Sequence, residues 1–406
     1  MGERISFPRK CWRAFLRGYY AFEHGVMIDP KRLERWKRLF SLLPVRNNKV
    51  VVNNFCGKGY GENAKYIVEE LLRRPRKYKI IWMVDEKREG FPQGVRPVPY
   101  YSLRAYFESA TAKVWIFNSR NCRLTEKREC QIYLQTWHGG IGIKKIEKDA
   151  EEKLSRKYVD AAKEDGRVTD GILADWAYIE DIYRRAFWLN DNCEILRFGS
   201  PRADVLCSGK ETEAIKIETR RKLGIQQDAY VVLYAPTFRN SGTTEGYIND
   251  LEAVREAFAR RHKNAVILVR LHPNVARTAS DLQYGFSNIL INVTDYADQQ
   301  ELIITSDCVI TDYSSIIYDF ALMRKPGFLC MKDEDAYIAE RGVYDFFYDQ
   351  PFQMNHQENE LVEEITTFHE DEYQIRLDAF FNKYPSYNAG KASKKAVDWL
   401  ISKGLS

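Results

Sequence analysis

Two histidines at the ends of strand-like runs are the first candidates for chemistry in this chain of 406 residues. His138 follows the run I-Y-L-Q-T-W and precedes Gly139 and Gly140, whose missing side chains let the backbone approach a ligand closely. His272 follows A-V-I-L-V-R-L, and a proline ends that strand directly after it. Ligands of parallel α/β sheets bind beyond the carboxyl ends of strands. A single histidine at the end of a strand is structural at least as often as it is functional. Two such histidines in separate halves of the chain indicate a functional site.

Two serines follow a third apolar run, in S-D-C-V-I-T-D-Y-S-S-I-I-Y-D-F. The strand should end at Thr311, a polar turn that includes Asp312 should follow, and a helix should begin at Ser314 and Ser315. A serine in this position caps a helix, which is a sufficient structural reason for it. Hydroxyls and free N–H groups at a helix start also bind anions such as a pyrophosphate, so both interpretations stay open.

A fourth run, V-V-L-Y-A-P-T-F-R-N, leads from a strand to Thr237 and Arg239. The guanidinium of Arg239 is suited to charge-assisted hydrogen bonds with a phosphate. The glycine-containing segment of Gly57, Lys58 and Gly59 matches neither the dinucleotide-binding spacing nor a Walker loop. We interpret it as a flexible loop of a cleft.

Strands alternating with helices must position these residues. Strands are expected at residues 49–53, 79–84, 113–118, 129–135, 171–174, 230–235, 265–271, 289–292, 308–311 and 327–331, and helices at residues 63–72, 251–261 and 315–323. This alternation is typical of parallel sheets covered by helices. Because the pattern restarts after residues 205–225, the sequence predicts an α/β fold with two Rossmann-like domains that face a cleft.

The N-terminus differs from the rest of the chain in charge. Residues 1–50 contain twelve Lys and Arg against four Asp and Glu, whereas the whole chain has a net charge of +5. Residues 11–21 and 31–43 place Trp, Phe and Leu at helical spacing between basic residues, which is typical of helices that lie on anionic membranes. The alternative is a solvated helix that packs its apolar side on the protein. No nucleic-acid-binding motif accompanies the charge.

The eight cysteines are scattered, without a C-x-x-C pair or a spacing that suits a metal site. We therefore expect reduced thiols and no tightly bound metal. No run approaches the ~18 consecutive apolar residues of a membrane-spanning helix, and no secretory signal is evident.

Taken in order, seven segments resemble the CDP-glycerol glycerophosphotransferase family, which includes teichoic acid primases and polymerases. The resemblance covers residues 50–350 and rests on N-N-F-C-G-K-G-Y-G-E-N-A-K-Y-I, Q-T-W-H-G-G-I-G-I-K-K, F-G-S-P-R-A-D-V-L, L-Y-A-P-T-F-R, R-L-H-P, I-T-D-Y-S-S-I-I-Y-D-F-A-L and E-R-G-V-Y-D-F. It implies a glycosyltransferase-B-like fold that holds the donor nucleotide mainly in its C-terminal domain.

Site roles follow from the same resemblance. His138 would be the general base and His272 would contact the donor pyrophosphate. The donor-binding residues would be Thr237, Arg239, Arg270, Thr311, Asp312, Ser314, Ser315, Arg341 and Gly342. The acceptor side would include Gly57, Lys58, Gly59, Gly139 and Gly140.

The charge pattern, the alternation of strands and helices and the resemblance together give a domain plan and partners. Residues 1–48 would be membrane-associating helices, 49–210 the acceptor domain, 211–375 the CDP-donor domain, and 376–406 helices that pack back on the body. The donor would be CDP-glycerol, the acceptor a lipid-linked glycan or teichoic-acid-like polymer, and the location the cytoplasmic face of the membrane, with no tightly bound cofactor.

One departure affects the substrates. Better-known members read W-H-G-T-P where this chain has Gly140 and Ile141, so CDP-ribitol is an alternative donor. Two further alternatives are a nucleotide-sugar glycosyltransferase or sugar epimerase of the same architecture, and a non-catalytic membrane adaptor.

Overall fold

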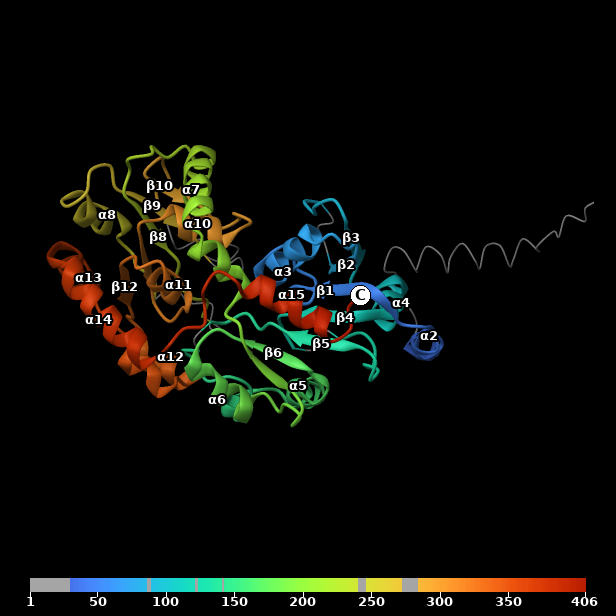
Figure 1. Cartoon of the computed structure of the whole chain (residues 1–406). Coiled ribbons are helices and arrows are strands. Elements are labelled where there is room, and N and C mark those ends of the chain that lie inside the picture. Colours follow the sequence, from blue (N-terminus) through green and yellow to red (C-terminus); the bar gives the residue numbers. More distant parts are fainter. Residues whose placement is uncertain (1–29, 86–88, 121–122, 141, 240–245, 272–283) are drawn as a thin grey trace, which may run out of the picture.

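A computed structural model describes residues 30–85, 89–120, 123–140, 142–239, 246–271 and 284–406. Two parallel sheets, each with its own helices, form two lobes side by side (Figure 1). The predicted pair of Rossmann-like domains is thereby confirmed. The limits proposed for the domains stay predictions. His272, Ile141 and the predicted helix at 11–21 lie outside the described residues.

The N-terminal lobe is built on a seven-stranded parallel sheet with the order β3-β2-β1-β4-β5-β6-β7. Its strands are β1 (Arg46–Asn53), β2 (Lys79–Val84), β3 (Val95–Pro99), β4 (Ala112–Phe117), β5 (Ile132–Gln135), β6 (Gly171–Ala174) and β7 (Glu194–Arg197). Its helices are α3 (Glu62–Arg73), α4 (Leu103–Thr111), η1 (Glu147–Lys153), α5 (Arg156–Val168) and α6 (Ala177–Ala186). The central strands are apolar and buried because helices cover both faces of the sheet.

The C-terminal lobe has a six-stranded parallel sheet with the order β10-β9-β8-β11-β12-β13. Its strands are β8 (Val231–Tyr234), β9 (Val266–Val269), β10 (Leu290–Asn292), β11 (Cys308–Thr311), β12 (Gly327–Cys330) and β13 (Met354–Asn355). Its helices are α7 (Gly209–Leu223), α8 (Leu251–Ala259), α10 (Gln299–Thr305), α11 (Ile316–Leu322), α12 (Glu334–Arg341), η3 (Asp345–Asp349), α13 (Glu358–Thr367) and α14 (Glu370–Lys383).

Strand order reverses at one place in each sheet, between β1 and β4 in the first and between β8 and β11 in the second. In each sheet, the connections from the two strands at the reversal run to opposite sides of the sheet, which leaves a crevice at the carboxyl ends of these strands. The segments that begin at Asn54, Asn118, Ala235 and Asp312 start at these crevices. The residues that follow these four strands are therefore candidates for ligand binding.

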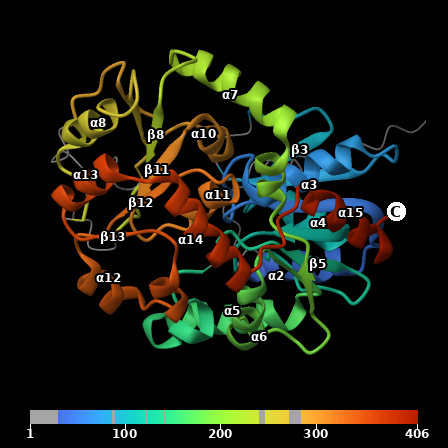
Figure 2. The same ribbon diagram turned by 60° about the vertical axis from the view of Figure 1, so that its left-hand side comes forward.

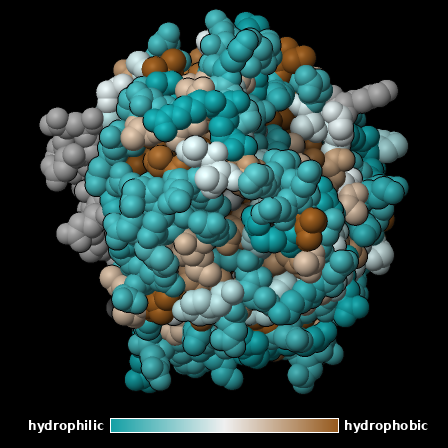
Figure 3. Space-filling model, turned by 90° about the vertical axis from the view of Figure 1, so that its left-hand side faces the viewer, coloured by the Kyte–Doolittle hydropathy of each residue, from teal (hydrophilic) through white to brown (hydrophobic). Residues whose placement is uncertain are grey.

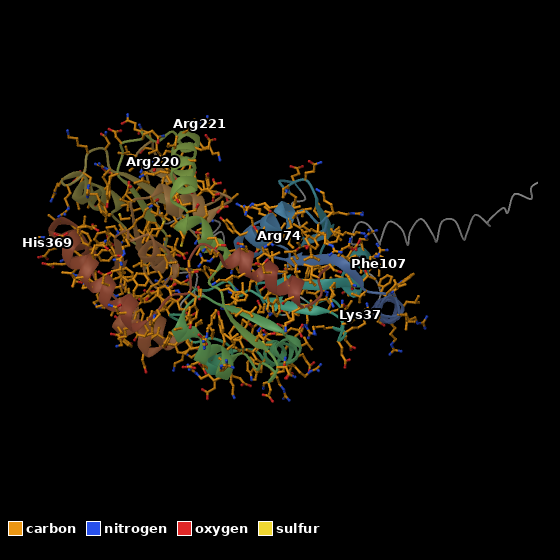
Figure 4. All side chains as sticks on the ribbon, in the orientation of Figure 1. Lys37, Arg74, Phe107, Arg220, Arg221 and His369 are labelled. Carbon is orange, nitrogen blue, oxygen red and sulfur yellow. The ribbon has the colours of Figure 1, made fainter. Side chains whose placement is uncertain are left out.

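The chain passes between the lobes twice. It enters the C-terminal lobe through η2 (Pro201–Cys207) and returns to place α15 (Ala392–Ser402) beside α3 (Figures 1 and 2). Arg74, labelled in Figure 4, forms an ion pair of 2.8 Å with Asp398 of α15. The two passages touch, because the Ser200 amide donates to Asn388 Oδ1 at 2.7 Å. Gly199 has φ +86°, and a Cβ there would lie 2.8 Å from the Asn388 side chain.

One N-terminal helix, α2 (Pro30–Ser41), belongs to the described part of the chain, and the predicted helix at 31–43 largely coincides with it. Phe40 packs into the core against α4, whereas Trp36, Leu39 and Leu42 are exposed. In the part of the chain that the structure covers, no helix is both long and apolar enough to span a membrane.

The thiol prediction holds for five described cysteines, which are free: Cys130, Cys193, Cys207, Cys308 and Cys330. It is wrong for Cys56, which is disulfide-bonded. The fold brings the segment after β1 against the segment after β4, where Cys56 Sγ lies 3.5 Å from the Arg120 carbonyl oxygen. Cysteine spacing along the chain does not reveal this proximity.

Candidate active site

His138 follows β5 and lies next to the strand reversal of the N-terminal sheet. Its Nδ1 is 2.6 Å from the carbonyl oxygen of Asn118, the residue that follows β4. A carbonyl oxygen only accepts hydrogen bonds, so Nδ1 carries the proton and Nε2 keeps its lone pair. Backbone geometry thus fixes this imidazole as a proton acceptor at Nε2.

The ring is held by its neighbours. Its centroid lies 4.2 Å from the Trp137 ring and 4.9 Å from the Phe55 ring. Trp137 itself has φ +50°, a left-handed conformation that is uncommon for a bulky residue, and its amide donates to Gln135 Oε1 at 3.0 Å. Strain of this kind persists only where surrounding contacts enforce it, and it often accompanies functional sites.

Burial lowers the pKa of His138 below its ordinary value of 6.5, and the nearby Arg202 charge acts in the same direction. The Asn118 hydrogen bond opposes this shift in part. At neutral pH the imidazole is therefore uncharged, which is the protonation state that a general base requires.

A cavity of about 250 Å³ opens beside His138 and is bounded by both lobes. We call it the histidine cavity. Besides His138, the N-terminal lobe contributes the loop of Gly139, Gly140 and Lys144, and the C-terminal lobe contributes Thr237, Tyr313, Ser314 and Ser315. The structure thus brings His138 together with three of the predicted donor-binding residues.

A second cavity, of about 410 Å³, lies at the carboxyl ends of β8, β9, β10 and β11. This strand-end cavity is lined by Arg270, Thr294 and Gln299, and shares Lys144, Thr237 and Ser314 with the histidine cavity. None of the described residues that line either cavity is Asp or Glu. The adjoining cavities are therefore suited to an anionic ligand that extends from the C-terminal sheet toward His138.

Arg239 occupies a different environment from the one predicted. Its guanidinium is 4% exposed and donates to both carboxylate oxygens of Asp333, at 2.6 and 2.9 Å. It also pairs with Asp312 at 2.9 Å and donates to Thr237 Oγ1 at 2.6 Å. We call this group, Arg239 with Thr237, Asp312 and Asp333, the arginine clamp. The predicted phosphate contact of Arg239 stays a prediction, and the clamp holds the loop that lines both cavities.

Asp312 and Thr311 support the same loop. The Thr237 amide donates to Asp312 Oδ1 at 2.9 Å, and the Thr311 hydroxyl donates to the Ala235 carbonyl oxygen at 2.6 Å. Both side chains are buried. Neither residue lines a cavity, so their contacts are those of positioning residues.

Gly342 links the lobes through the backbone. It has φ +68°, and its carbonyl oxygen accepts from the Lys145 amide at 3.1 Å. Next to it, Lys144 and Val343 form an antiparallel bridge. The side chain of Arg341 lies outside what the structure describes. The donor-binding role of Arg341 and Gly342 stays a prediction, and the backbone contacts of Gly342 and Val343 attach the loop after His138 to the C-terminal lobe.

The loop of Gly57, Lys58 and Gly59 follows β1, at the same sheet edge as His138. Gly57 has φ +116°, and a Cβ there would lie 2.9 Å from the Cβ of Asp85. None of these three residues lines either cavity. Their acceptor-side role stays a prediction.

Beside Gly140, in the loop that follows His138, lies a buried charged group that the sequence did not indicate. Arg202 of η2 pairs with Asp319 of α11 at 2.5 Å and approaches Glu62 of α3 at 3.8 Å. Asp175 lies beside them, and burial raises its pKa to about 6. A Cβ at Gly140 would lie 3.3 Å from Asp175 Oδ2. Arg202 thus joins both lobes directly under the segment that carries His138.

No group of three or more His, Cys, Asp or Glu side chains with metal-binding geometry occurs among the described residues. The expectation that no metal is tightly bound stays a prediction.

Comparisons with known proteins place this geometry in a family. The family described as CDP-glycerol:poly(glycerophosphate) glycerophosphotransferase matches residues 36–402. The teichoic acid poly(glycerol phosphate) polymerase of Staphylococcus epidermidis is 30% identical, over 94% of this chain and 55% of its own length. The teichoic acid glycerol-phosphate transferase of Staphylococcus aureus is 31% identical, over 90% of this chain and 95% of its own length. Ribitol-phosphate enzymes are among the other relatives.

Solved structures agree. The wall teichoic acid polymerase TagF superimposes with a TM-score of 0.81 at 27% identity, over 98% of both chains, and a variant of it was soaked with CDPG. UDP-GlcNAc 2-epimerase of Neisseria meningitidis shares the fold alone, with a TM-score of 0.54 at 15% identity over 87% of this chain and all of its own. The chain spans about half the length of two of the curated polymerases that it matches. Since the family match takes in both lobes, this chain belongs to the CDP-glycerol:poly(glycerophosphate) glycerophosphotransferase family.

Proposed function

We propose that this chain transfers glycerol phosphate from CDP-glycerol to a hydroxyl group of a teichoic-acid-like acceptor and releases CMP. The observation that carries the proposal is the hydrogen bond from His138 Nδ1–H to the Asn118 carbonyl oxygen. It leaves Nε2 as a proton acceptor in a cavity that both lobes line. Family membership supplies the class of reaction.

In the proposed reaction the acceptor hydroxyl gives its proton to His138 Nε2 and its oxygen attacks the β-phosphorus of the donor. The bond between that phosphorus and the bridging oxygen breaks, and CMP leaves with the bridging oxygen. An alcohol is a poor nucleophile, and general-base assistance typically contributes ~10²–10⁴-fold.

The donor would occupy the strand-end cavity, with its phosphates near Thr237, Ser314 and Ser315. This placement is supported by the position of the cavity at the strand reversal and by the absence of carboxylates among its described lining residues. The contact of His272 with the donor pyrophosphate, which the family resemblance implies, stays part of the proposal, since His272 lies outside the described residues.

The test uses the full chain with a lipid-linked disaccharide acceptor that does or does not carry one glycerol phosphate. CDP-glycerol, CDP-ribitol and a UDP-sugar are offered in parallel, and the products are analysed by mass. We expect an added mass of one or more glycerol phosphates and equimolar CMP. His138→Ala should lower the rate of CMP release by at least about 10² while CDP-glycerol still binds.

Transfer from the UDP-sugar alone would refute the proposal, and preference for CDP-ribitol would correct the polyol. An unchanged rate in His138→Ala would refute the base assignment. A matched control is His262→Ala, because His262 stacks on Tyr230 away from both cavities and should not affect catalysis.

We also propose that the enzyme acts at the membrane surface, where a lipid-linked acceptor would be found. The support is α2 and the turn that follows it, where Trp36, Leu39 and Leu42 are exposed next to Arg35 and Arg38. By contrast, the face of the C-terminal lobe in Figure 3 is mainly hydrophilic, with scattered apolar residues. Replacing the three exposed apolar residues by serine should reduce sedimentation with anionic vesicles, and equal binding by the variant would refute this placement.

A further inference from the structure

Lys144 belongs to both cavities. It is the sixth residue after His138 and comes from the N-terminal lobe, yet it lines the strand-end cavity of the C-terminal lobe as well as the histidine cavity. Thr237 and Ser314 are the other residues that the two cavities share, and both are uncharged. Lys144 therefore lies where a ligand would pass from one cavity to the other.

The backbone of Lys144 is fixed across the lobes by an antiparallel bridge to Val343. On either side of it, the Tyr344 amide donates to the Ile143 carbonyl oxygen at 3.0 Å, and the Lys145 amide donates to the Gly342 carbonyl oxygen at 3.1 Å. This attachment holds Lys144 toward the C-terminal lobe.

Aromatic rings support the lysine side chain. Lys144 Nζ lies 5.3 Å from the centroid of the Tyr337 ring, a cation–π distance. Tyr337 stacks on Tyr313 with 3.7 Å between ring centroids, and Tyr313 precedes Ser314. The ammonium is thereby kept beside the segment that begins α11.

Few of the described residues that line the two cavities carry a positive charge. Among the described residues that line them, Lys144 and Arg270 are the only lysine or arginine residues. Arg270 donates from Nη1 to the carbonyl oxygens of Tyr296, at 2.8 Å, and Val293, at 3.3 Å, and lies only in the strand-end cavity. Among the described residues, Lys144 is thus the one lysine or arginine that lines the histidine cavity.

We propose that Lys144 is a catalytic residue that contacts the donor phosphates and stabilises the charge that develops as CMP leaves. The inference rests on the proposed function. In the step described above, the bridging oxygen takes the electron pair of the broken bond to phosphorus, and the acceptor proton goes to His138. An ammonium group at the junction of the cavities offsets the new charge without taking part in proton transfer.

The experiment compares Lys144→Met, Lys144→Arg and the matched control Lys145→Met in the full chain. Lys145 is exposed and lines neither cavity. The measurements are kcat and KM for CMP release from CDP-glycerol with the lipid-linked disaccharide acceptor, the Kd of CMP, and the melting temperature. We expect kcat of Lys144→Met to fall by about 10²–10³, the loss typical of removing one charge-stabilising donor. The Kd of CMP should change much less, Lys144→Arg should recover at least tenfold, and Lys145→Met should match the wild type.

The inference is overturned if the wild type is active and Lys144→Met keeps its kcat, or if only KM rises. It is also overturned if Lys144→Met and Lys144→Arg lose activity equally and both melt earlier, since that pattern indicates a structural role. If the wild type releases no CMP from either CDP-polyol, the proposed function itself fails, and the two failures are thereby distinguishable.

Discussion

Replacing Arg239 by methionine should destabilise the C-terminal lobe rather than simply weaken donor binding. The guanidinium is 4% exposed and Asp312 is 2% exposed, so the substitution leaves a buried carboxylate without its counter-charge. Asp333, which is 20% exposed, loses two hydrogen bonds from the same group. Removing one partner of a buried ion pair typically costs about 3–5 kcal/mol. For a domain of this size each kcal/mol lowers the melting temperature by roughly 2–4 °C, so we expect a loss of about 6–20 °C.

The assay is thermal unfolding followed by circular dichroism, because residues 211–375 contain no tryptophan to report on this lobe by fluorescence. The control is Arg221→Met. Arg221, labelled in Figure 4, is exposed on α7 and pairs with Glu218 of the same helix, so its loss should not change the melting temperature. Combining Arg239→Met with Asp333→Asn should cost less than the sum of the single changes, because the second change removes one of the stranded charges.

The alternative for Arg239 is the phosphate contact expected from sequence. That alternative predicts that Arg239→Met melts within about 2 °C of the wild type, which is less than the smallest loss expected from breaking the clamp. It also predicts that CMP binds at least about tenfold more weakly, which corresponds to a loss of about 1.4 kcal/mol of binding free energy. Such a result would refute the clamp as the main role of Arg239.

Three further predictions concern His138, Arg202 and Gly342. Because burial lowers the pKa of His138 below 6.5, the acid limb of kcat/KM should have its midpoint below pH 6.5; an acid limb centred above 6.5 would contradict the neutral-base assignment. Arg202→Met should cost about 3–5 kcal/mol, read as an earlier thermal transition by tryptophan fluorescence, since it strands the buried Asp319 at the junction of the lobes; unchanged melting would show that the pair is dispensable. Gly342→Ala should cost about 1–3 kcal/mol because φ is +68° and ψ is 146°, and should lower kcat by displacing Lys144; a fully active, equally stable variant would refute the anchoring role.

The regular strands were predictable because their sequences carry the signal locally. Residues 79–84, 171–174 and 308–311 are short apolar runs between polar or turn-forming residues, and they form β2, β6 and β11 with those limits. By contrast, β3 contains two prolines in V-R-P-V-P and was not predicted. Its place at the sheet edge explains why prolines are tolerated there.

The site was predictable only in part, for a physical reason. The residues at strand ends could be identified from pattern, and His138, Thr237, Arg270, Ser314 and Ser315 do line the cavities. The partners of a side chain are set by tertiary contacts that no local pattern encodes. Arg239 meets Asp333 from a segment 94 residues away. Likewise, nothing in K-K distinguishes Lys144 from Lys145, because only the bridge to Val343 decides which one faces the cavities.

The contact between the two inter-lobe passages has a consequence for motion. Because the two connecting segments are joined by a hydrogen bond between Ser200 and Asn388, a rotation of one lobe relative to the other that keeps this bond would have to turn about this junction. The junction is also intolerant of bulk, since Gly199 has no room for even a methyl group. Substrate entry and product exit would then require rotation about a hinge that lies outside the active site, and the rate of this rotation could be changed by substitutions there without altering a catalytic group.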